Sequence, residues 1–348
     1  MIKYLNFLTN ICLSKIRRPY PFSSVFWITD RCNSRCKMCG IWDIRDKKEM
    51  DLDTFNRIFR ESKLLRRLSL VTFTGGEPFI KDDLAEFVKV VNKFASPLNI
   101  TLDTNGFATE KIINTIDKIL AESKTPINVK LSVDGIGEIH DEIRGINGGF
   151  KMCMNTIDEL CRIKKRYPRH LWISLGFTAN RRNYDHIDKI IGLARSKGIG
   201  FFYKPVMRAQ KLANKDMEDV LLLTEPQRDY LVKRHKAIMN GLSGSYFAKR
   251  YLYRKYLSFL DKYYLKPYRY ITCYALSASF HISSDWKVFS CLQHCWAIGD
   301  LKYATFDEVF NGESASLIRQ RIKNSRCHCL CTGDIFPSIL TNNFPFYL

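Results

Sequence analysis

Residues 29–40 read TDRCNSRCKMCG and place Cys32, Cys36 and Cys39 at the spacing C-x3-C-x2-C. This stretch directly follows a β-branched and aromatic run at 24–29, so it is predicted to form a loop at the end of a strand. No fourth Cys or His lies nearby, whereas a closed zinc site needs four ligands. An iron–sulfur cluster with one iron left without a protein ligand fits three thiolates. Structural zinc and buried structural cysteines are the alternative interpretations.

Alternating strand and helix patterns extend from this loop toward the C-terminus. Short β-branched or aromatic runs predict strands at 24–29, 68–73, 98–103, 127–133, 171–178 and 199–203. Apolar residues at i, i+3 and i+4 predict helices at 54–65, 84–94, 111–123, 152–166 and 184–196. Six such units predict a parallel sheet, either a full or partial barrel or an open doubly wound sheet. In both, reactive residues belong at the carboxyl ends of the strands.

A second motif, TGGEP at 74–78, ends the second predicted strand. Gly75 and Gly76 would let the backbone approach a ligand closely, and Glu77 supplies a carboxylate. This motif lies one strand–helix unit beyond the three cysteines. A ligand bound to the iron that has no protein ligand would lie close to it.

A third motif closes the fourth predicted strand. It contains Ser132 and Asp134 in LSVDG at 131–135, followed by Arg144 in HDEIRG at 140–145. Ser132 is able to hydrogen-bond a ribose or a carboxylate, and Arg144 is able to form a bidentate pair with a carboxylate.

These features together resemble the radical S-adenosylmethionine (radical SAM) superfamily over about residues 22–208. The resemblance implies an α/β fold, a partial (β/α)6 TIM-type barrel, in which Cys32, Cys36 and Cys39 hold a 4Fe-4S cluster. Its open iron would be chelated by the amino and carboxylate groups of S-adenosylmethionine. The implied reaction is reductive cleavage of S-adenosylmethionine to a 5′-deoxyadenosyl radical, which abstracts hydrogen from a second substrate.

The resemblance also implies the S-adenosylmethionine contacts. Glu77 and the backbone of Gly75 and Gly76 would hold the methionine ammonium. Arg144 would bind the methionine carboxylate, and Ser132 the ribose or carboxylate side. Further residues expected in this pocket are Met38, Thr104, Asn105 and Asp134. At Met38 the family usually has an aromatic residue beside adenine, and Met is apolar enough to pack on the ring. No residue is assigned as a catalytic acid or base.

A second group of cysteines lies near the C-terminus. Cys273 and Cys291 flank a predicted hairpin, with runs at 280–282 and 288–289. This pattern resembles the auxiliary-cluster extension called SPASM or, in its shorter form, twitch, and implies at least one auxiliary 4Fe-4S cluster. Cys273 and Cys291 would be ligands, and the candidates for about two further places are Cys327, Cys329 and Cys331, with Cys295 and His328 as alternates. Structural zinc is the competing interpretation. The isolated Cys12, Cys153 and Cys161 are predicted to be small buried hydrophobes.

Composition limits the class of protein. With 348 residues, 46% hydrophobic and 26% charged, the chain is globular, which excludes disorder, collagen and coiled coil. The formal net charge of +20 predicts a positive field that attracts phosphates, anionic headgroups or acidic peptides. Twelve cysteines are too dilute for a disulfide scaffold, and no apolar run is long enough to span a bilayer. We therefore expect a cytoplasmic protein.

Two segments outside the barrel combine basic and apolar residues. In residues 1–20 four basic and no acidic residues accompany one apolar helical face, with Phe7 on the opposite side. This pattern is typical of an interfacial helix at the inner face of an anionic membrane, and also of a helix that caps the barrel floor. Residues 227–270 hold eleven Lys/Arg, two Asp and nine tyrosines, which predicts a helical bridge, either a packed connector or a surface for polyanions. We see no RNA-binding motif and expect no nucleic-acid partner.

The predicted organisation has five parts: an amphipathic helix at 1–21, a radical SAM barrel at 22–210, the bridge at 211–272, an auxiliary-cluster domain at 273–335 and a tail at 336–348. We expect an enzyme that modifies a peptide, a natural product or another small molecule, supplied with electrons by a donor such as flavodoxin or ferredoxin. The alternatives are a membrane-associated radical enzyme acting on lipids or glycans, and a non-catalytic, metal-stabilised binding module.

Overall fold

The chain is built around one curved, nine-stranded sheet. The computed structural model describes residues 2–16, 19–214, 221–240, 247–325, 327–328 and 331–344. The strands are β1 (Ser23–Thr29), β2 (Leu70–Gly75), β3 (Asn99–Thr104), β4 (Ile127–Ser132), β5 (Leu171–Ala179), β6 (Gly200–Pro205), β7 (Ser279–Ile282), β8 (Lys287–Phe289) and β9 (Ala297–Asp300). Their order is β6-β5-β4-β3-β2-β1-β7-β8-β9, with β1 to β6 parallel to their neighbours. This arrangement confirms the predicted partial barrel.

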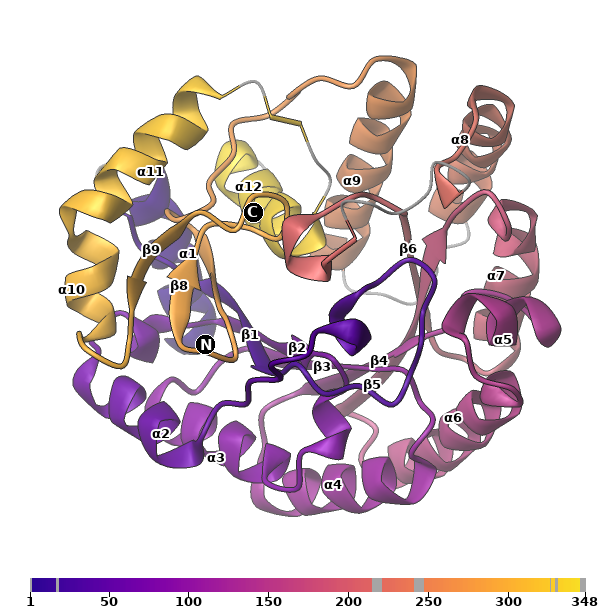
Figure 1. Ribbon diagram of the computed structural model, residues 1–348, viewed down its shortest axis with the longest axis horizontal. Helices are drawn as coiled ribbons and strands as arrows, with labels where there is room; N and C mark the ends of the chain where they lie inside the picture. The colour runs from indigo at the N-terminus through magenta and orange to yellow at the C-terminus, as the bar shows by residue number, and fades with distance from the viewer. Residues whose placement is uncertain are drawn as a thin grey trace.

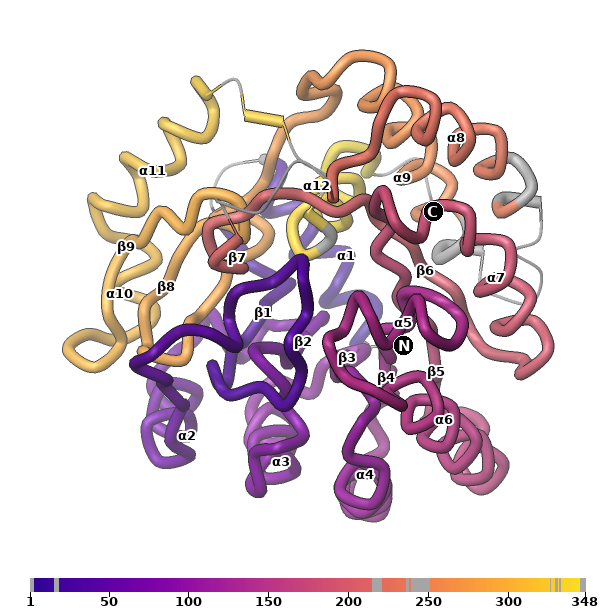
Figure 2. Tube along the Cα trace, turned by 45° about the vertical axis from the view of Figure 1, so that its right-hand side comes forward, coloured from indigo at the N-terminus to yellow at the C-terminus, as the bar shows by residue number. Residues whose placement is uncertain are grey.

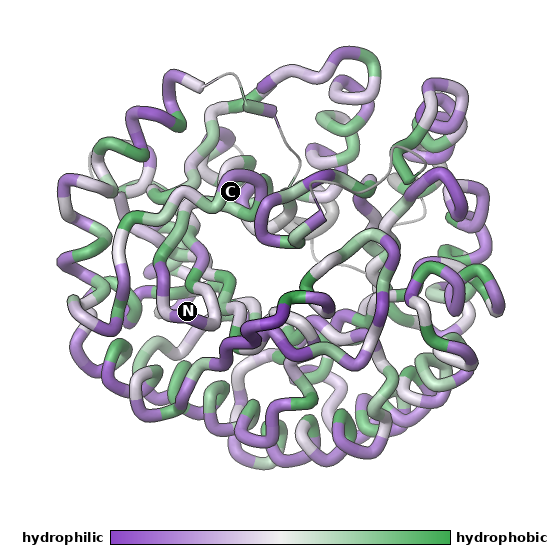
Figure 3. The backbone as a smooth tube through the Cα atoms, viewed as in Figure 1, coloured by the Kyte–Doolittle hydropathy of each residue, from purple (hydrophilic) through white to green (hydrophobic). Residues whose placement is uncertain are grey.

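The helices lie mostly on the outer side of the sheet, with the last one inside the ring that they form (Figures 1 and 2). They are α1 (Ile2–Ile16), α2 (Leu52–Glu61), α3 (Leu84–Phe94), α4 (Thr109–Glu122), α5 (Glu138–Arg144), α6 (Gly149–Arg166), α7 (Ile187–Ser196), α8 (Glu225–Asn240), α9 (Phe247–Leu265), α10 (Phe306–Asn311), α11 (Glu313–Asn324) and α12 (Thr332–Asn343). α12 packs against β1, β7 and α9 and so closes the sheet from inside the ring of helices. Figure 3 shows hydrophobic and hydrophilic residues alternating along the outer helices, as expected for helices that bury one face.

The two faces of the sheet differ because alternate strand residues point to opposite sides. On the helix-facing side, Phe26 pairs in register with Phe73, and Phe73 with Leu102, and all three are fully buried. Phe26 and Phe73 stack with ring centroids 5.7 Å apart. On the concave side the corresponding residues are polar: Thr101 on β3 is followed in register by Asn128 on β4. The main hydrophobic core therefore lies outside the barrel, whereas the concave face carries polar side chains on β2 to β5 and apolar ones such as Trp27 on β1 and Phe202 on β6.

The predicted hairpin is present, but it does not form a separate layer. β7 runs parallel to β1, with Val25 opposite His281, while β8 and β9 continue the sheet in antiparallel fashion. The segment that carries Cys291 is thus attached to the barrel by backbone hydrogen bonds. Sequence periodicity gives no information on this pairing, because the two strands lie far apart in the chain.

The N-terminal segment is helical, and it buries a different face from the one that periodicity favours. Phe7 contacts Phe22 edge-on at 5.5 Å, and Ile11 is fully buried beside Leu340. Leu5, on the expected apolar face, is 65% exposed. Placing Phe7 on the polar side was therefore wrong for the folded chain, because tertiary contacts of Phe7 and Ile11 decide which face packs. None of the helices in the described part of the chain combines the length and apolarity needed to cross a membrane.

The bridge consists of α8 and α9, which pack against each other. Tyr253, Tyr256, Leu257 and Leu260 of α9 are buried, and the Tyr253 hydroxyl accepts a hydrogen bond from the backbone N–H of Tyr203 on β6 at 3.1 Å. The aromatic residues of α9 thus serve as a packed connector.

Candidate functional site

A large cavity of about 620 Å³ opens along the concave face and the carboxyl ends of the strands. Cys32, Cys36 and Cys39 line it. The other predicted site residues that line it are Met38, Gly75, Gly76, Glu77, Thr104, Asn105, Ser132 and Arg144. Asp134 does not line the large cavity; it lies fully buried behind Arg144. The structure therefore brings together residues from four separate strand ends and from α5.

The cysteine loop is held against the C-terminal end of α5. The backbone N–H of Arg35 donates to the carbonyl of Arg144, and that of Lys37 to the carbonyl of Ile143, both at 2.9 Å. The Ser34 hydroxyl also donates to the Arg144 carbonyl at 2.9 Å. These hydrogen bonds fix a loop that has no regular secondary structure. They leave its three thiols available to bind metal.

The sulfur atoms receive polar contacts from the same elements. The Ser34 backbone N–H donates to Cys32 Sγ at 3.4 Å, and the Ser34 hydroxyl lies 3.0 Å from Cys36 Sγ. Arg144 Nη1 donates to Cys36 Sγ at 3.6 Å. The Ser34 N–H and the Arg144 guanidinium are donors in these contacts, and a donor next to a sulfur stabilises its thiolate form, which is the form that binds metal.

The donor set fits an iron–sulfur cluster. Burial raises the pKa of Cys32 to about 12 and of Cys39 to about 11, and neighbouring thiols add to the shift. These thiols are therefore neutral at physiological pH, and a bound cation would reverse this by stabilising the thiolates. In the described part of the chain, no three Cys, His, Asp or Glu side chains already stand in a metal-binding arrangement. The fit thus rests on three thiols in one loop, facing one cavity.

The two glycines of the second motif bring strand ends together. Gly75 has φ +146°, and a Cβ at this position would lie 2.3 Å from the Thr29 carbonyl oxygen. A Cβ on Gly76 would lie 2.0 Å from the carbonyl oxygen of Arg31. The Gly76 and Glu77 N–H groups donate to these two carbonyls at 2.7 and 2.8 Å. The two glycines were expected to let the backbone approach a ligand closely. In the structure their closest neighbours are backbone atoms at the end of β1 and in the cysteine loop.

Glu77 is the buried acid of the site, with only 1% of its surface exposed. Its carboxylate accepts from the Thr104 hydroxyl at 2.8 Å, from the Asn105 N–H at 2.7 Å and from the Phe79 N–H at 3.1 Å. Burial raises the pKa of Glu77 to about 7, although these hydrogen bonds act in the opposite direction. Thr104 and Asn105 thus position the acid, and the Asn105 side chain reaches Asn33 of the cysteine loop at 2.7 Å.

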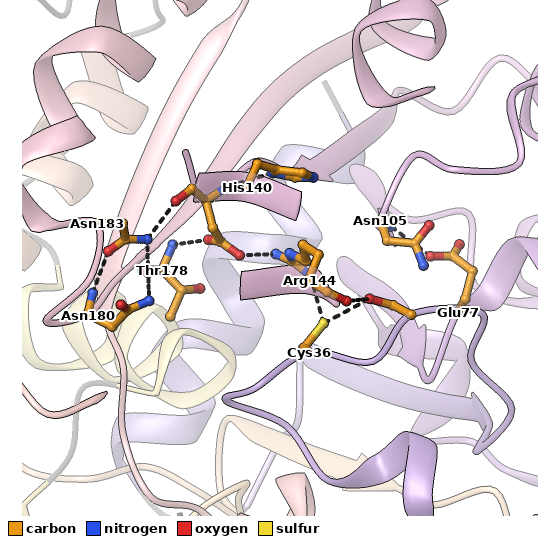
Figure 4. Close-up of polar contacts among 10 residues, drawn as sticks. Cys36, Glu77, Asn105, His140, Arg144, Thr178, Asn180 and Asn183 are labelled. Carbon is orange, nitrogen blue, oxygen red and sulfur yellow. Dashed lines mark hydrogen bonds and ion pairs between the residues drawn. The ribbon is translucent and has the colours of Figure 1, made fainter. Parts of the chain in front are cut away.

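Arg144 lies between an acid and a thiol, as Figure 4 shows. Asp134 Oδ2 is 2.5 Å from Arg144 Nη2, and Asp134 Oδ1 accepts from the Thr178 N–H at 2.8 Å. Burial alone would lower the pKa of Arg144, but Asp134 and Cys36 outweigh it, so the net shift is upward. Arg144 Nε is buried without a hydrogen-bond partner among the described residues. An anion in the cavity would meet a guanidinium that is charged and only partly satisfied.

Sequence reasoning missed the groups that support Asp134. Asn183 donates from its side chain to the Asp134 carbonyl at 2.7 Å, and its Oδ1 accepts from the Asn180 N–H at 2.7 Å. His140 Nδ1 accepts from the Asp134 N–H at 3.2 Å. Burial and the nearby Arg144 lower the pKa of His140 to about 3, so it is neutral and structural. Nothing local in the sequence marks these residues, since they act through contacts between distant loops.

A second, small cavity of about 50 Å³ lies beside the C-terminal cysteines and is lined by Cys273, Cys327 and Asp334. Cys327 Sγ accepts from Arg269 Nη2 at 2.8 Å and from the Ser325 hydroxyl at 3.1 Å. Burial raises the pKa of Cys273 to about 12, and Cys327 adds to the shift. These two candidate auxiliary ligands therefore face a common space.

The other candidate auxiliary ligands are distributed differently. Cys291 is buried, and burial, followed by Asp334, raises its pKa to about 12. Cys331 lines the large cavity, not the small one. Cys295 is half-buried, and the His328 ring lies 5.7 Å from that of Tyr263. Cys329 lies outside the described residues.

The cysteines predicted to be small hydrophobes differ in their burial. Cys153 is fully buried in the main core, whereas Cys12 and Cys161 are half-buried.

Comparison with known proteins bears on the fold and on this site. Residues 28–194 match the family model described as "Radical SAM superfamily". The sporulation killing factor maturation protein SkfB of Bacillus subtilis is 26% identical over 183 residues, which is 52% of this chain and 42% of SkfB. The pre-heme d1 synthase of Dinoroseobacter shibae is 27% identical over 203 residues, 58% of this chain and 47% of the synthase. The chain thus spans less than half the length of these two curated relatives.

A solved structure extends the likeness in fold beyond the barrel. Streptococcus suis SuiB, bound to its precursor peptide SuiA, superposes with a TM-score of 0.63 and 14% identity, over 91% of this chain and 70% of SuiB. The shared fold therefore includes most of the part that follows the barrel. The family match runs from the end of β1 into α7, the part of the chain that carries the cysteine loop, Glu77 and Arg144. Residues 28–194 of this chain thus form a domain of the radical SAM superfamily, whose enzymes use a 4Fe-4S cluster and S-adenosylmethionine.

Proposed function

We propose that this chain cleaves S-adenosylmethionine reductively and uses the product to modify a peptide. When bound, the cluster and S-adenosylmethionine together supply a carbon-centred radical that removes hydrogen from an unactivated C–H bond. The observation that carries the proposal is that Cys32, Cys36, Cys39, Glu77 and Arg144 line one cavity at the carboxyl ends of the barrel strands.

The chain's own residues would bind and orient the reactants. Cys32, Cys36 and Cys39 would hold the cluster. Glu77, fixed by three hydrogen bonds, presents a carboxylate for an ammonium group, and Arg144 presents a charged guanidinium for a carboxylate. Enclosure of the cavity by α9 and α12, through Tyr253 and Phe336, would exclude water from the reacting groups.

Two observations favour a peptide as the second substrate. SkfB is named for the maturation of a killing factor, and SuiB, which shares the fold, was solved with a precursor peptide. In addition, hydroxyl and amide side chains such as Thr72, Thr101, Asn128 and Ser174 line the large cavity, and these groups suit peptide carbonyl and N–H groups. A flavodoxin or ferredoxin would supply the electron.

We also propose the division of the chain into a barrel at 22–210, a bridge at 211–272 and an auxiliary-cluster domain at 273–335. Cys273, Cys291 and Cys327 would bind the auxiliary cluster. The pairing of β7 with β1 would fix this domain directly beside the barrel.

The first experiment compares the wild type with a Cys32→Ala/Cys36→Ala/Cys39→Ala variant after anaerobic reconstitution. Iron, sulfide and dithionite-dependent formation of 5′-deoxyadenosine are measured in both, with Cys161→Ala as a cysteine control outside the site. We expect the wild type and the control to form 5′-deoxyadenosine, and the triple variant to form none while it keeps part of its iron. A wild type that binds zinc and forms no 5′-deoxyadenosine would overturn the proposal and favour a metal-stabilised binding module.

A further inference from the structure

Charged side chains on the concave face occur mostly as internal pairs. Asp103 on β3 and Lys130 on β4 are register partners, and Asp103 Oδ1 lies 2.8 Å from Lys130 Nζ. Asp134 and Arg144 form the second pair. In each pair the two charges compensate each other inside the protein.

Lys204 on β6 differs from these residues. It stands opposite Thr178 of β5, and its side chain lines the large cavity. Lys204 is half-buried, and because it lines the large cavity, its remaining accessible surface faces that cavity. Among the residues that the structure describes, no carboxylate lies within ion-pair distance of Lys204.

An enclosed ammonium group without a counter-ion is unfavourable. Enclosure lowers the pKa of Lys204, and the like charge of Lys130 lowers it further, while Cys331 and Asp103 act in the opposite direction. A Met side chain would fill the same space without this cost. An unpaired cation that faces a cavity of ligand-binding size therefore indicates a negatively charged ligand.

We propose that Lys204 binds a carboxylate of the substrate inside the large cavity, such as an aspartate or glutamate side chain or a peptide C-terminus. The proposal deepens the proposed function, since it rests on that function only for the substrate being a peptide. One unpaired ammonium balances one negative charge, which favours a carboxylate over a doubly charged phosphate. The Thr178 hydroxyl, on the neighbouring strand, is a second donor at the same level of the sheet.

S-adenosylmethionine is the other possible source of a carboxylate in this cavity. Arg144, 3.6 Å from Cys36 Sγ, is the better partner for that group because it lies at the cysteine loop. Lys204 projects from β6, at the other end of the parallel part of the sheet, but because the sheet is curved its charge also reaches Cys39. The affinity of Lys204→Met for S-adenosylmethionine therefore distinguishes the two sources of a carboxylate.

The test measures binding without turnover. Equilibrium dialysis of the reconstituted protein uses labelled acetyl-Gly-Glu-Gly-amide and its neutral analogue acetyl-Gly-Gln-Gly-amide at millimolar concentrations, with labelled S-adenosylmethionine as a third probe. The variants are Lys204→Met, which removes the charge, and Lys204→Arg, which keeps it. Lys302→Met removes one exposed charge outside the cavity and is the matched control.

We expect the wild type, Lys204→Arg and Lys302→Met to bind the Glu peptide about tenfold more tightly than the Gln peptide. Lys204→Met should lose this preference, keep its affinity for S-adenosylmethionine, and unfold at the same or a higher temperature, because an unpaired buried charge has been removed. Equal binding of both peptides by the wild type, binding of neither, or a preference that survives in Lys204→Met overturns the proposal.

Two further results would also overturn it. If Lys204→Met loses affinity for S-adenosylmethionine about tenfold, the carboxylate belongs to that molecule. If Lys204→Met unfolds at a markedly lower temperature, Lys204 has a structural role. Failure to form 5′-deoxyadenosine would overturn the proposed function instead, while the peptide preference in dialysis would still decide the role of Lys204.

Discussion

The Asp134 carboxylate and the Arg144 guanidinium form a buried ion pair, with Oδ2 and Nη2 2.5 Å apart. The Asp134 side chain is fully buried, and that of Arg144 is 10% exposed. Because the same guanidinium also reaches Cys36 Sγ, the pair links the fourth strand of the barrel to the cysteine loop. Asp134 is thus a positioning residue, and Arg144 is the group that faces the cavity.

Removing the acid from this pair should be costly. In Asp134→Asn the Arg144 charge remains buried without a counter-charge, and we expect the free energy of unfolding to fall by about 3 kcal/mol. The control is Asp117→Asn, which breaks the exposed Asp117–Arg166 pair and should change stability by no more than about 0.5 kcal/mol. Urea unfolding of both variants and the wild type checks this. Equal losses in the two variants would contradict the role assigned to Asp134.

A methyl group at Gly76 should disrupt the approach of β2 to the cysteine loop. A Cβ there would meet the Arg31 carbonyl at 2.0 Å, a contact that only backbone movement relieves. We expect Gly76→Ala to lower the free energy of unfolding by more than about 2 kcal/mol and to reduce the iron bound at the loop. Gly192→Ala in α7, where a Cβ meets nothing within 4 Å, should be neutral or stabilising by up to about 1 kcal/mol. Chemical unfolding and iron analysis of the two variants distinguish a local clash from a general effect of alanine.

Local periodicity predicted the barrel well because its elements are strongly patterned. The helix expected at 84–94 is α3 with the same bounds, since Leu84, Phe87, Val88 and Val91 repeat at helical spacing and are all buried. The strands were also found, with ends shifted by a few residues, because each is a β-branched or aromatic run bounded by polar or glycine-bearing segments.

What the sequence did not predict depends on contacts between distant segments. The sequence motif predicted that Asp134 and Arg144 both contact the ligand. Only the fold shows that Asp134 instead positions Arg144 through an ion pair. Likewise, Lys204 belongs to no recognisable sequence motif. Only the structure shows that it lines the large cavity. The position of β7 beside β1 and the burial of Phe7 were also decided by tertiary packing.

The stability of the protein should depend on pH through Glu77. Burial raises the pKa of Glu77 from its ordinary value of 4.5 to about 7, so between these values the folded state binds a proton that the unfolded chain has released. Stability contributed at this site is therefore present below about pH 4.5 and is lost as pH rises through about 7, by on the order of 3 kcal/mol.

Glu77→Gln isolates this contribution because other titrating groups cancel in the difference from the wild type. Without S-adenosylmethionine, the variant should gain stability relative to the wild type as pH rises from about 5 to about 8. Unfolding measured in urea at several pH values gives this difference. A difference that does not change with pH would show that Glu77 ionises in the folded state at its ordinary pKa.

The C-terminal cysteines should differ in their effect on iron content. Two 4Fe-4S clusters would give about eight irons per chain. Cys273 and Cys327 line the small cavity together, so alanine at either should reduce the reconstituted iron to about four while 5′-deoxyadenosine formation from S-adenosylmethionine persists. Cys331 faces the large cavity, and Cys331→Ala should keep about eight irons, as should the control Cys161→Ala. Loss of four irons in Cys331→Ala would instead make Cys331 an auxiliary ligand, which would require the chain before α12 to turn its thiol away from the large cavity when the cluster binds.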